Sequence, residues 1–552
     1  MGRNIMDLRE ALGLLSKASP YAVTTSGGIS DPKLRAIKDY LYIDTEVEKV
    51  FRNRLESVRD GDIIFLCGSS GDGKSEILTR YDQEYGDDVD FHLDATHSFQ
   101  PEDTAIDTLN QVFSRQKASS RPLVVGINIG MLANYEREGS NDHQTIKSAI
   151  AKFLPKASIY SVPDVEQKYS FINFEAFPKF SIAEDRISSK FFSMLLNRVV
   201  VDDQGNNFRD LFNASLGLCD QNSAGIDTKR LVSNYLMLRD RGVQRVVVEL
   251  LLNARIRQDQ FITARMLLDF IYCILTGEKY LFDNLFEGGD NEILQALSEF
   301  DPSVKRDKAL DQFVLNRSLN IDDKSFKQFR SEAKDKFKVD SRGKVNVQSL
   351  VRQLFILRYT KLESAFPNNF TNSFSDYAGR KYREIWSLVK NYSGDGAERK
   401  VIRRFYEDIV FSAIGYYANR NAPYLSKGEL YLSTHGLFDV ASEAELTIEY
   451  KRIENDPCAD IHSFNLHMAV NDEPLDAFPL NINLLSLLIN VVAGYRPNKH
   501  DKNSVVLLDE LVNHIRVSVG RADTLFLFKY GERIAKVKQT SDEEIRVGNL
   551  RL

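Results

Sequence analysis

Residues 61–75 read Gly-Asp-Ile-Ile-Phe-Leu-Cys-Gly-Ser-Ser-Gly-Asp-Gly-Lys-Ser, an apolar run that ends in a glycine-rich loop. The loop matches the pattern G-x-x-x-x-G-K-[ST], with Gly68, Gly73, Lys74 and Ser75 at the fixed positions. Such glycines let successive N–H groups point at an anion, and a helix that follows directs its positive end at the same place. The stretch therefore predicts a phosphate-binding loop.

The sequence on both sides of the loop agrees with this prediction. A strand is expected at Ile63–Cys67 and a helix from Glu76 to Tyr81, whereas a plain glycine-rich turn, the alternative, requires neither. Lys74 can reach the β- and γ-phosphates of a nucleotide, and the Ser75 hydroxyl can ligate Mg²⁺. The residues expected to surround the phosphates are Gly68, Ser69, Ser70, Gly71, Asp72, Gly73, Lys74, Ser75 and Glu76.

Length and composition indicate a multidomain globular protein. A chain of 552 residues is too long for one hydrophobic core, and 43% apolar with 27% charged residues is typical of soluble proteins. The longest apolar stretch, Leu484–Ala493, is too short to cross a membrane. Four widely separated cysteines argue against a disulfide scaffold or a zinc site and favour the reducing cytoplasm. A net charge of −6 suggests that partners make most of any nucleic-acid contact.

The order of expected elements divides the chain into five segments. Short apolar runs at 63–67, 89–93, 123–129 and 169–174 alternate with helical patterns, which predicts a mostly parallel sheet with nucleotide at its carboxyl edge. We expect an α/β fold, a P-loop NTPase core of the AAA+ or STAND type. The predicted segments are an N-terminal helical segment (1–60), the nucleotide-binding core (61–184), a helical lid (185–290), a helical domain (291–392) and a C-terminal α/β domain (393–552).

A nucleotide hydrolase also needs an acid that holds Mg²⁺ or polarises water, usually at the end of a neighbouring strand. Asp94, which closes Asp90-Phe91-His92-Leu93-Asp94, is the best candidate for both roles, and Glu175 is a weaker one. An acid in this position can instead be a helix cap or a turn residue. No apolar run ending in Asp-Glu occurs between residues 95 and 121, so the acid pair of a strong ATPase is absent or displaced.

Two further residues are candidates for sensing the γ-phosphate. Asn128 follows a buried strand, the position at which AAA+ and related ATPases carry an Asn that orients the attacking water; alternatively it only starts the turn at Gly130. Arg265 lies in the predicted lid helix Thr263–Asp269 and could lean over the phosphate, or be a solvated helix residue.

Two other patterns in the sequence match known motifs. Asn498–Asp501 matches the guanine-reading N-K-x-D motif but lies too far from Lys74 for one GTPase domain, so ATP is the expected nucleotide. Asp439, Glu449 and Lys451 resemble the D…E-x-K set of metal-dependent nucleases, although a half-exposed strand gives the same letters.

Two basic clusters are candidates for DNA contact. They consist of Arg380, Lys381 and Arg383, interleaved with Tyr382 and Trp386, and of Lys400, Arg403 and Arg404. Cations beside aromatics can follow a nucleic-acid backbone, but such runs are more often solvated helix faces.

The sequence from Phe65 to Leu78 resembles the P-loop of the DptF family of DNA phosphorothioation-dependent restriction proteins. The Asn-bearing strand through Gly130-Met131-Leu132 and the helix Thr263–Asp269 are also similar to that family's ATPase core. The resemblance implies an ATP-binding subunit that acts with DptG-like and DptH-like partners against DNA lacking the sulfur mark, in the bacterial cytoplasm and in antiviral defence.

Three functions remain open from the sequence. The first is an ATP-binding and ATP-hydrolysing component of a restriction complex, with Lys74, Asp94, Asn128 and Arg265 as catalytic residues and Ser75 and Asp94 on Mg²⁺. The second is a nucleotide-binding scaffold without turnover, which the missing acid pair favours. The third, a nuclease subunit, would use Asp439, Glu449 and Lys451.

Overall fold

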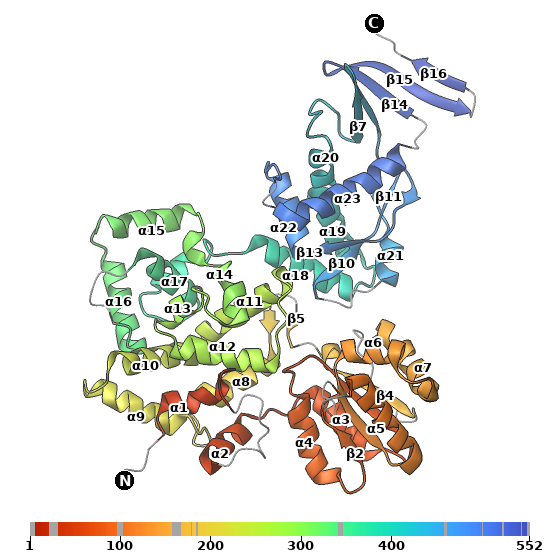
Figure 1. The fold of residues 1–552 in the computed structure, drawn as a ribbon. Helices are drawn as coiled ribbons and strands as arrows, with labels where there is room; N and C mark the ends of the chain where they lie inside the picture. The colour runs from red at the N-terminus through yellow and green to blue at the C-terminus, as the bar shows by residue number, and fades with distance from the viewer. Residues whose placement is uncertain are drawn as a thin grey trace. The chain divides into compact units, whose positions relative to one another are not determined.

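The computed structural model describes residues 6–20, 31–95, 103–156, 167–177, 179–183, 186–340, 346–456, 461–498, 501–520, 524–541 and 544–548. The chain divides into two compact units (Figure 1). The first comprises Met1–Ser181 and Ile187–Ser375, and the second comprises Ile182–Arg186 and Asp376–Leu552.

A parallel sheet of four strands lies in the first unit, and its order is β2-β3-β1-β4. The strands are β1 (Ile63–Cys67), β2 (Asp90–His92), β3 (Leu123–Ile127) and β4 (Tyr169–Asn173). Cys67 lies opposite Ile127 on one side and opposite Asn173 on the other. The predicted α/β fold with a parallel sheet is therefore confirmed.

Helices cover both faces of this sheet, which explains why β1 and β3 are apolar throughout. On one face Ile64, Leu66 and Val124 pack with apolar residues of α3 (Glu46–Glu56) and α4 (Lys74–Tyr85). On the other face Phe65 and Val125 pack with apolar residues of three helices. These are α5 (Ala105–Ser119), α6 (Ile129–Glu138) and α7 (Gln144–Phe153).

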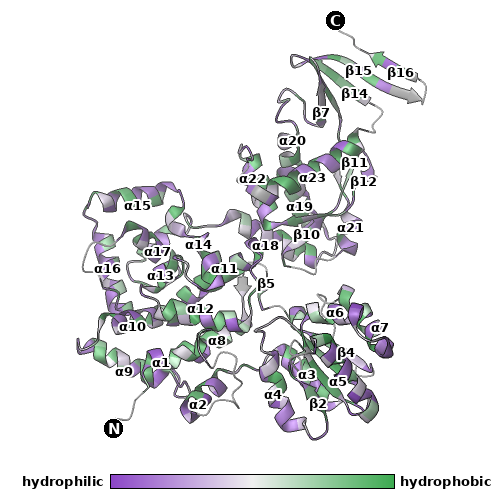
Figure 2. Cartoon of the chain, in the orientation of Figure 1, coloured by the Kyte–Doolittle hydropathy of each residue, from purple (hydrophilic) through white to green (hydrophobic). Residues whose placement is uncertain are grey.

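The rest of the first unit is mainly helical. Its helices are α1 (Leu8–Leu12), α2 (Pro32–Leu41), α8 (Lys190–Val200), α9 (Arg209–Asp220), α10 (Ile226–Arg239), α11 (Arg241–Arg257), α12 (Ala264–Thr276), α13 (Leu281–Asn284), α14 (Glu292–Ser298), α15 (Lys308–Ser318), α16 (Lys324–Phe337) and α17 (Val347–Leu357). Short strands β5 (Ser181–Ala183) and β6 (Arg186–Ser188) pair with each other near the point where the chain passes between the units. Hydrophilic and hydrophobic residues are interleaved along the helices, as expected where one helix face packs inward (Figure 2).

The second unit mixes helices with antiparallel strands. Its helices are α18 (Tyr377–Lys390), α19 (Gly396–Phe405), α20 (Ser412–Ala418), α21 (Tyr450–Asn455), α22 (Ile482–Val492) and α23 (Lys502–Val519), and a π-helical turn at Tyr406–Phe411 joins α19 to α20. A five-stranded sheet has the order β16-β15-β14-β8-β7, a three-stranded sheet the order β12-β11-β9, and β10 pairs with β13. The strands are β7 (Glu429–His435), β8 (Phe438–Glu443), β9 (Leu446–Ile448), β10 (Ser463–Leu466), β11 (Met468–Val470), β12 (Glu473–Pro474), β13 (Phe478–Asn481), β14 (Thr524–Lys529), β15 (Glu532–Ser541) and β16 (Glu544–Gly548).

Two elements end at other residues than the sequence predicts. The strand predicted at 123–129 ends at Ile127 because Asn128 caps α6. Near the N-terminus, the helical pattern becomes α1 followed by a 3-10 turn at Gly13–Leu15, where glycine weakens the helix. None of the helices in the described ranges combines the length and apolar character that a bilayer crossing requires.

Candidate functional site

The glycine-rich loop joins the carboxyl end of β1 to the start of α4. Gly71 has φ 85° and Gly73 has φ 101°, a left-handed region that side chains other than glycine rarely adopt. These two residues let the chain turn from the strand into the helix within six residues, Gly68 to Gly73. The loop therefore lies at the carboxyl edge of the parallel sheet, where ligands of such folds bind.

The first turn of α4 faces this edge without a side-chain cap. Gly73 occupies the N-cap position, and no side chain in the described part of the chain caps it. The first N–H groups of a helix have no partner within the helix and carry its partial positive charge. Ser75 is exposed in this turn, and Glu76 is half-buried and pairs with Arg80 at 3.0 Å. The arrangement favours an anion at the start of α4.

Lys74 holds its ammonium against the loop. Its Nζ donates to the carbonyl oxygens of Gly68 and Ser69, both at 2.8 Å. Burial lowers the pKa of Lys74, while the negative charges of Asp72 and Asp94 oppose that shift and the charge of Arg265 adds to it. The structure thus brings the predicted residues Lys74, Asp94 and Arg265 into one electrostatic environment.

Asp94 follows the edge strand β2, so β3 separates it from β1. The backbone N–H of Ala95 donates to the Gly126 carbonyl at 2.9 Å, which fixes the chain beside β3. Asp94 is half-buried and is not the cap of α5, because Thr104 fills that position. Burial lowers the pKa of His92, and the Asp94 charge opposes this shift. Asp94 therefore lies at the carboxyl edge of the sheet.

Asn128 lies beside the loop but has a structural task. Its Oδ1 accepts the N–H of Met131 at 2.6 Å and so caps α6. The Gly68 N–H donates to the Ile127 carbonyl at 3.2 Å, so the ends of β1 and β3 stay aligned. The Asn128 oxygen therefore has the local, turn-forming role that was the alternative to phosphate sensing. Any contact of Asn128 with a ligand would be made by its amide NH₂ group.

Arg265 reaches the loop through the start of α12. Its backbone N–H donates to the Gly71 carbonyl at 3.1 Å, and Thr263 caps the helix by accepting the Met266 N–H at 3.2 Å. A Cβ at Gly71 would lie 3.2 Å from both the Thr263 hydroxyl and the Arg265 Cβ. The N-terminus of α12 therefore packs directly on the glycine-rich loop, and glycine at position 71 permits that close approach.

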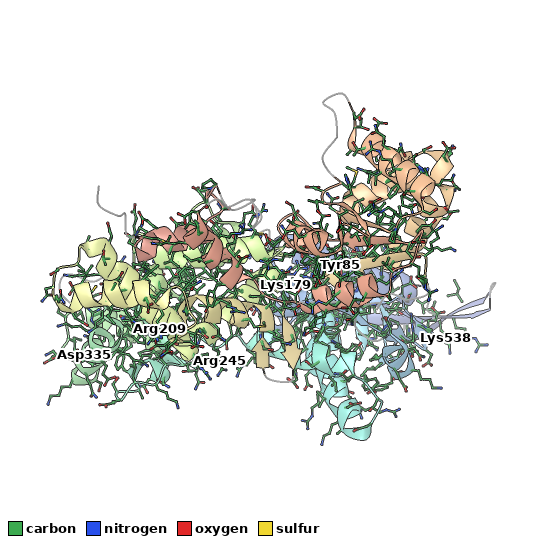
Figure 3. All side chains as sticks on the ribbon, turned by 90° about the horizontal axis from the view of Figure 1, so that it is seen from below. Tyr85, Lys179, Arg209, Arg245, Asp335 and Lys538 are labelled. Atoms are coloured by element: carbon green, nitrogen blue, oxygen red, sulfur yellow. The ribbon has the colours of Figure 1, made fainter. Side chains whose placement is uncertain are left out.

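Two lysines that the sequence did not single out also lie at this site. Lys179 (labelled in Figure 3) forms an ion pair with Asp72, with 2.8 Å between Nζ and Oδ1. Burial lowers the pKa of Lys38 in α2; the charge of Glu76 opposes this shift and that of Arg265 adds to it. Lys179 is 107 residues from Asp72, and Lys38 belongs to an ordinary amphipathic pattern, so neither carried a sequence signal.

The remaining predicted residues have other contacts. Glu175 is exposed in a turn after β4, and its N–H donates to Asn173 at 3.2 Å. Arg403 pairs with Glu407 at 2.8 Å on an exposed helix face, and Lys381, with its side chain 18% exposed, pairs with Glu384 at 3.3 Å. In the guanine-type pattern, Lys499 and His500 lie outside the described residues.

The candidate nuclease residues belong to different elements, and the two strands concerned are in different sheets. Asp439 is in β8 and accepts hydrogen bonds from Tyr424 and Thr434, whereas Glu449 follows β9 and Lys451 lies in α21. Over the ranges that the structure covers, no group of three or more His, Cys, Asp or Glu side chains is placed to hold a metal ion.

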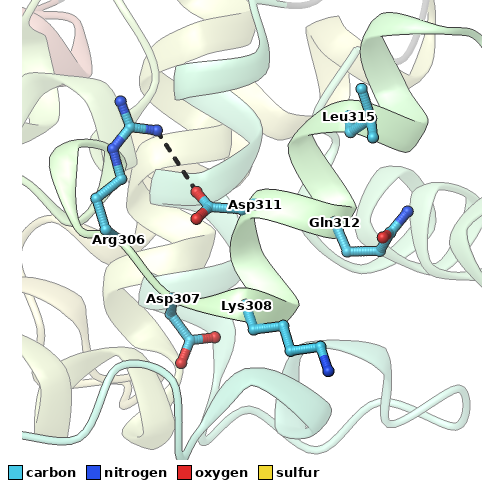
Figure 4. Close-up of a pocket in the computed structure, with 6 residues that line it drawn as sticks. All are labelled: Arg306, Asp307, Lys308, Asp311, Gln312 and Leu315. Carbon is cyan, nitrogen blue, oxygen red and sulfur yellow. Dashed lines mark hydrogen bonds and ion pairs between the residues drawn. The ribbon is translucent and has the colours of Figure 1, made fainter.

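A separate surface hollow lies on α15, away from the loop in the sequence (Figure 4). It is lined by Arg306, Asp307, Lys308, Asp311, Gln312 and Leu315. Arg306 and Asp311 form a weak ion pair at 3.5 Å. Its side chains are mostly exposed and include no convergent set of catalytic groups.

The loop with its neighbours from β2, β3 and α12 is the part of the described chain in which the most predicted site residues come together. No family model, no curated protein and no solved structure matches the chain. The ligand of this site is therefore inferred from its geometry and from the sequence.

Proposed function

We propose that this chain is an ATP-binding and ATP-hydrolysing component of a bacterial DNA phosphorothioation-dependent restriction system that acts against unmodified DNA. The observation that carries the nucleotide part is the loop between β1 and α4. Two glycines with positive φ, an uncapped helix start and a lysine held over the loop are what a polyphosphate needs.

The residues present fit ATP with Mg²⁺. Lys74 would exchange the carbonyls of Gly68 and Ser69 for phosphate oxygens and neutralise their charge. The exposed Ser75 hydroxyl and the Asp94 carboxylate are the groups that would hold Mg²⁺, which would supply positive charge against the phosphates. Catalysis of phosphoryl transfer depends on positioning and on charge, so side chains that only bind and orient suffice.

Arg265 and Asn128 are proposed to report the γ-phosphate. Arg265 is on a helix whose first residues bond the loop itself, so a change at the loop reaches α12 through the Arg265–Gly71 hydrogen bond. Asn128 caps α6 with its oxygen and could donate with its nitrogen. The output would be a conformational change in the helices that follow.

The restriction part rests on the sequence resemblance to the DptF family. It implies DptG-like and DptH-like partners, DNA contact made directly or through them, a role in antiviral defence and a place in the bacterial cytoplasm. The net charge of −6 agrees with partners that supply much of the basic surface.

The test is ATP binding and hydrolysis by the purified chain, with and without duplex DNA, against Lys74→Ala. We expect the wild type to bind Mg·ATP and to turn it over, and Lys74→Ala to lose at least about a hundredfold in affinity or rate while unfolding at the same temperature. Absence of nucleotide binding by the wild type would overturn the nucleotide part. Restriction of unmodified plasmid DNA in cells, lost with Lys74→Ala, tests the rest.

A scaffold that binds ATP without hydrolysis is the second candidate. The observation in its favour is that β2 and β3 are followed by Asp94 and Asn128 and not by a pair of acids, and that the Asn128 oxygen is already engaged as a cap. Binding without turnover, with assembly of the partners lost in Lys74→Ala, would identify this function.

A further inference from the structure

A carboxylate lies inside the glycine-rich loop, where a polyphosphate would meet it as a like charge. Asp72 is nearly inaccessible, with its side chain 1% exposed. Its Oδ2 accepts the backbone N–H of Ser69 at 2.8 Å, so the carboxylate already occupies one of the loop's donors. A Cβ at Gly68 would lie 3.2 Å from the same oxygen, so the carboxylate is packed on the first glycine of the loop.

Lys179 supplies the cation that balances this carboxylate. Its Nζ lies 2.8 Å from Asp72 Oδ1, and its side chain is 21% exposed. Two further contacts hold it in place, and one of them ties it to the start of α8. The Lys179 carbonyl accepts the Ser189 hydroxyl at 2.6 Å, Ser189 itself caps α8, and the Lys179 ammonium lies 5.8 Å from the centre of the Phe261 ring.

We propose that Lys179 is a positioning residue for nucleotide binding: it neutralises Asp72 so that the loop can accept a polyphosphate, an inference that rests on the proposed nucleotide binding. Charges that are shielded from water interact strongly, and a buried carboxylate without its cation repels an incoming anion. With Lys179 in place, Asp72 and Lys179 form a pair without net charge, and Asp72 keeps Ser69 ordered.

Removing the charge of Asp72 distinguishes this role of Lys179 from simple packing. If Lys179 only fills space, its loss weakens binding whether or not Asp72 is charged. If it neutralises Asp72, removing the Asp72 charge restores binding. Asparagine is nearly isosteric with aspartate and its oxygen can still accept the Ser69 N–H, so Asp72→Asn changes the charge and keeps the hydrogen bond.

The experiment measures the dissociation constants of Mg·ATP and ADP for six forms of the full chain by calorimetry. These are wild type, Lys179→Met, Lys179→Arg, Asp72→Asn, the double variant Asp72→Asn/Lys179→Met, and Lys190→Met. Lys190 forms an exposed ion pair with Glu46 at 3.2 Å and provides the matched lysine control. Thermal unfolding without nucleotide checks that each form is folded.

We expect Lys179→Met to raise the dissociation constant of Mg·ATP by at least about tenfold, and that of ADP by less because ADP carries less charge. Lys179→Arg, Lys190→Met and the double variant should bind within about threefold of wild type, and Asp72→Asn as tightly or more tightly. Equal binding by wild type and Lys179→Met would overturn the inference, as would a double variant as weak as Lys179→Met.

The outcomes separate this inference from the proposed function. If wild type binds no nucleotide, the proposed function fails. Suppose that wild type binds nucleotide and Lys74→Ala does not, but that the substitutions of Asp72 and Lys179 show no coupling in nucleotide affinity. The proposed function then stands, and only the role of Lys179 is refuted. Should Lys179→Met not fold, the Asp72→Asn and double variants decide alone, since loss of ATP affinity in either contradicts neutralisation of Asp72.

Discussion

Two clusters of charged side chains in the first unit differ in whether side chains or backbone groups are the hydrogen-bond partners of their cations. In the helical part, Arg352 of α17 donates to three carboxylates: Nη1 to Asp283 at 2.9 Å and to Glu287 at 2.8 Å, and Nη2 to Asp301 at 2.6 Å. Its Nε also bonds Asp301 at 3.1 Å. Every nitrogen of this guanidinium is engaged by the chain's own acids.

The loop cluster is organised differently. Lys74 has loop carbonyls as its hydrogen-bond partners, α4 begins without a cap, and the charge of Arg265 acts on Lys74. The comparison indicates that a buried charge cluster completed by side chains holds elements together, whereas one with backbone donors left over is suited to an outside anion. Four predictions probe this difference.

The largest effect is expected for Arg352→Met. The substitution leaves Asp283 and Asp301 buried without their cation, and breaking such a buried pair costs about 3–5 kcal/mol. We expect a lower thermal unfolding midpoint with an unchanged dissociation constant for ATP in the folded protein. Unchanged stability would mean that the Arg352 cluster does not hold α13 and α17 together.

The stability supplied by Arg352 should also disappear in acid. Burial alone would raise the pKa of Asp301, but hydrogen bonds from Arg352 and Ser303 more than offset it, so the pKa lies below its ordinary value. The pKa of Glu287 is likewise lowered by Lys279 and Arg352 against the effect of burial. A lowered carboxyl pKa stabilises the fold above the unfolded value of about 4, and this contribution is lost as pH falls through the folded value.

The measurement is the difference in unfolding midpoint between wild type and Arg352→Met as a function of pH. We expect the difference to be constant near neutrality and to shrink below about pH 4. A difference that grows on acidification would contradict the assigned direction.

A smaller effect is expected for Arg265→Ala. The substitution keeps the backbone N–H that bonds Gly71 and removes the side chain beyond Cβ together with its charge, so the loop should stay intact. We expect about tenfold weaker binding of ATP, with a smaller change for ADP, if the guanidinium meets the γ-phosphate. Arg245→Ala, which removes an exposed arginine that pairs with Glu249 at 3.1 Å, is the control. Equal losses for ATP and ADP would argue against γ-phosphate sensing.

The smallest effect is expected for Asn128. Asn128→Ala removes the cap of α6 and should cost about 1 kcal/mol of stability, whereas Asn128→Asp keeps a capping oxygen and should be neutral. If the Asn128 amide also serves the γ-phosphate, Asn128→Asp lowers the rate of ATP hydrolysis because it replaces an N–H donor with a negative charge. Full hydrolysis by Asn128→Asp would leave this residue with capping alone.

Local pattern predicted the sheet and the loop well. The apolar runs at 63–67 and 123–127 are strands because both faces are covered, and the second glycine that G-x-x-x-x-G-K-S fixes, Gly73, has a positive φ. The ends of elements were less predictable, since Asn128 could be read as the end of a strand or as the start of a helix. Its hydrogen bond to Met131 decides between them.

By itself, the sequence determined the parallel α/β core and the glycine-rich loop with its lysine after β1, because these depend on residues that are close in the chain. Only the tertiary structure decided that α12 packs on Gly71 and that Lys179 pairs with Asp72. It also placed Asp439 in β8 and Glu449 directly after β9, two strands of different sheets. These relations join residues that a local pattern cannot connect, because packing of whole elements sets which distant side chains meet.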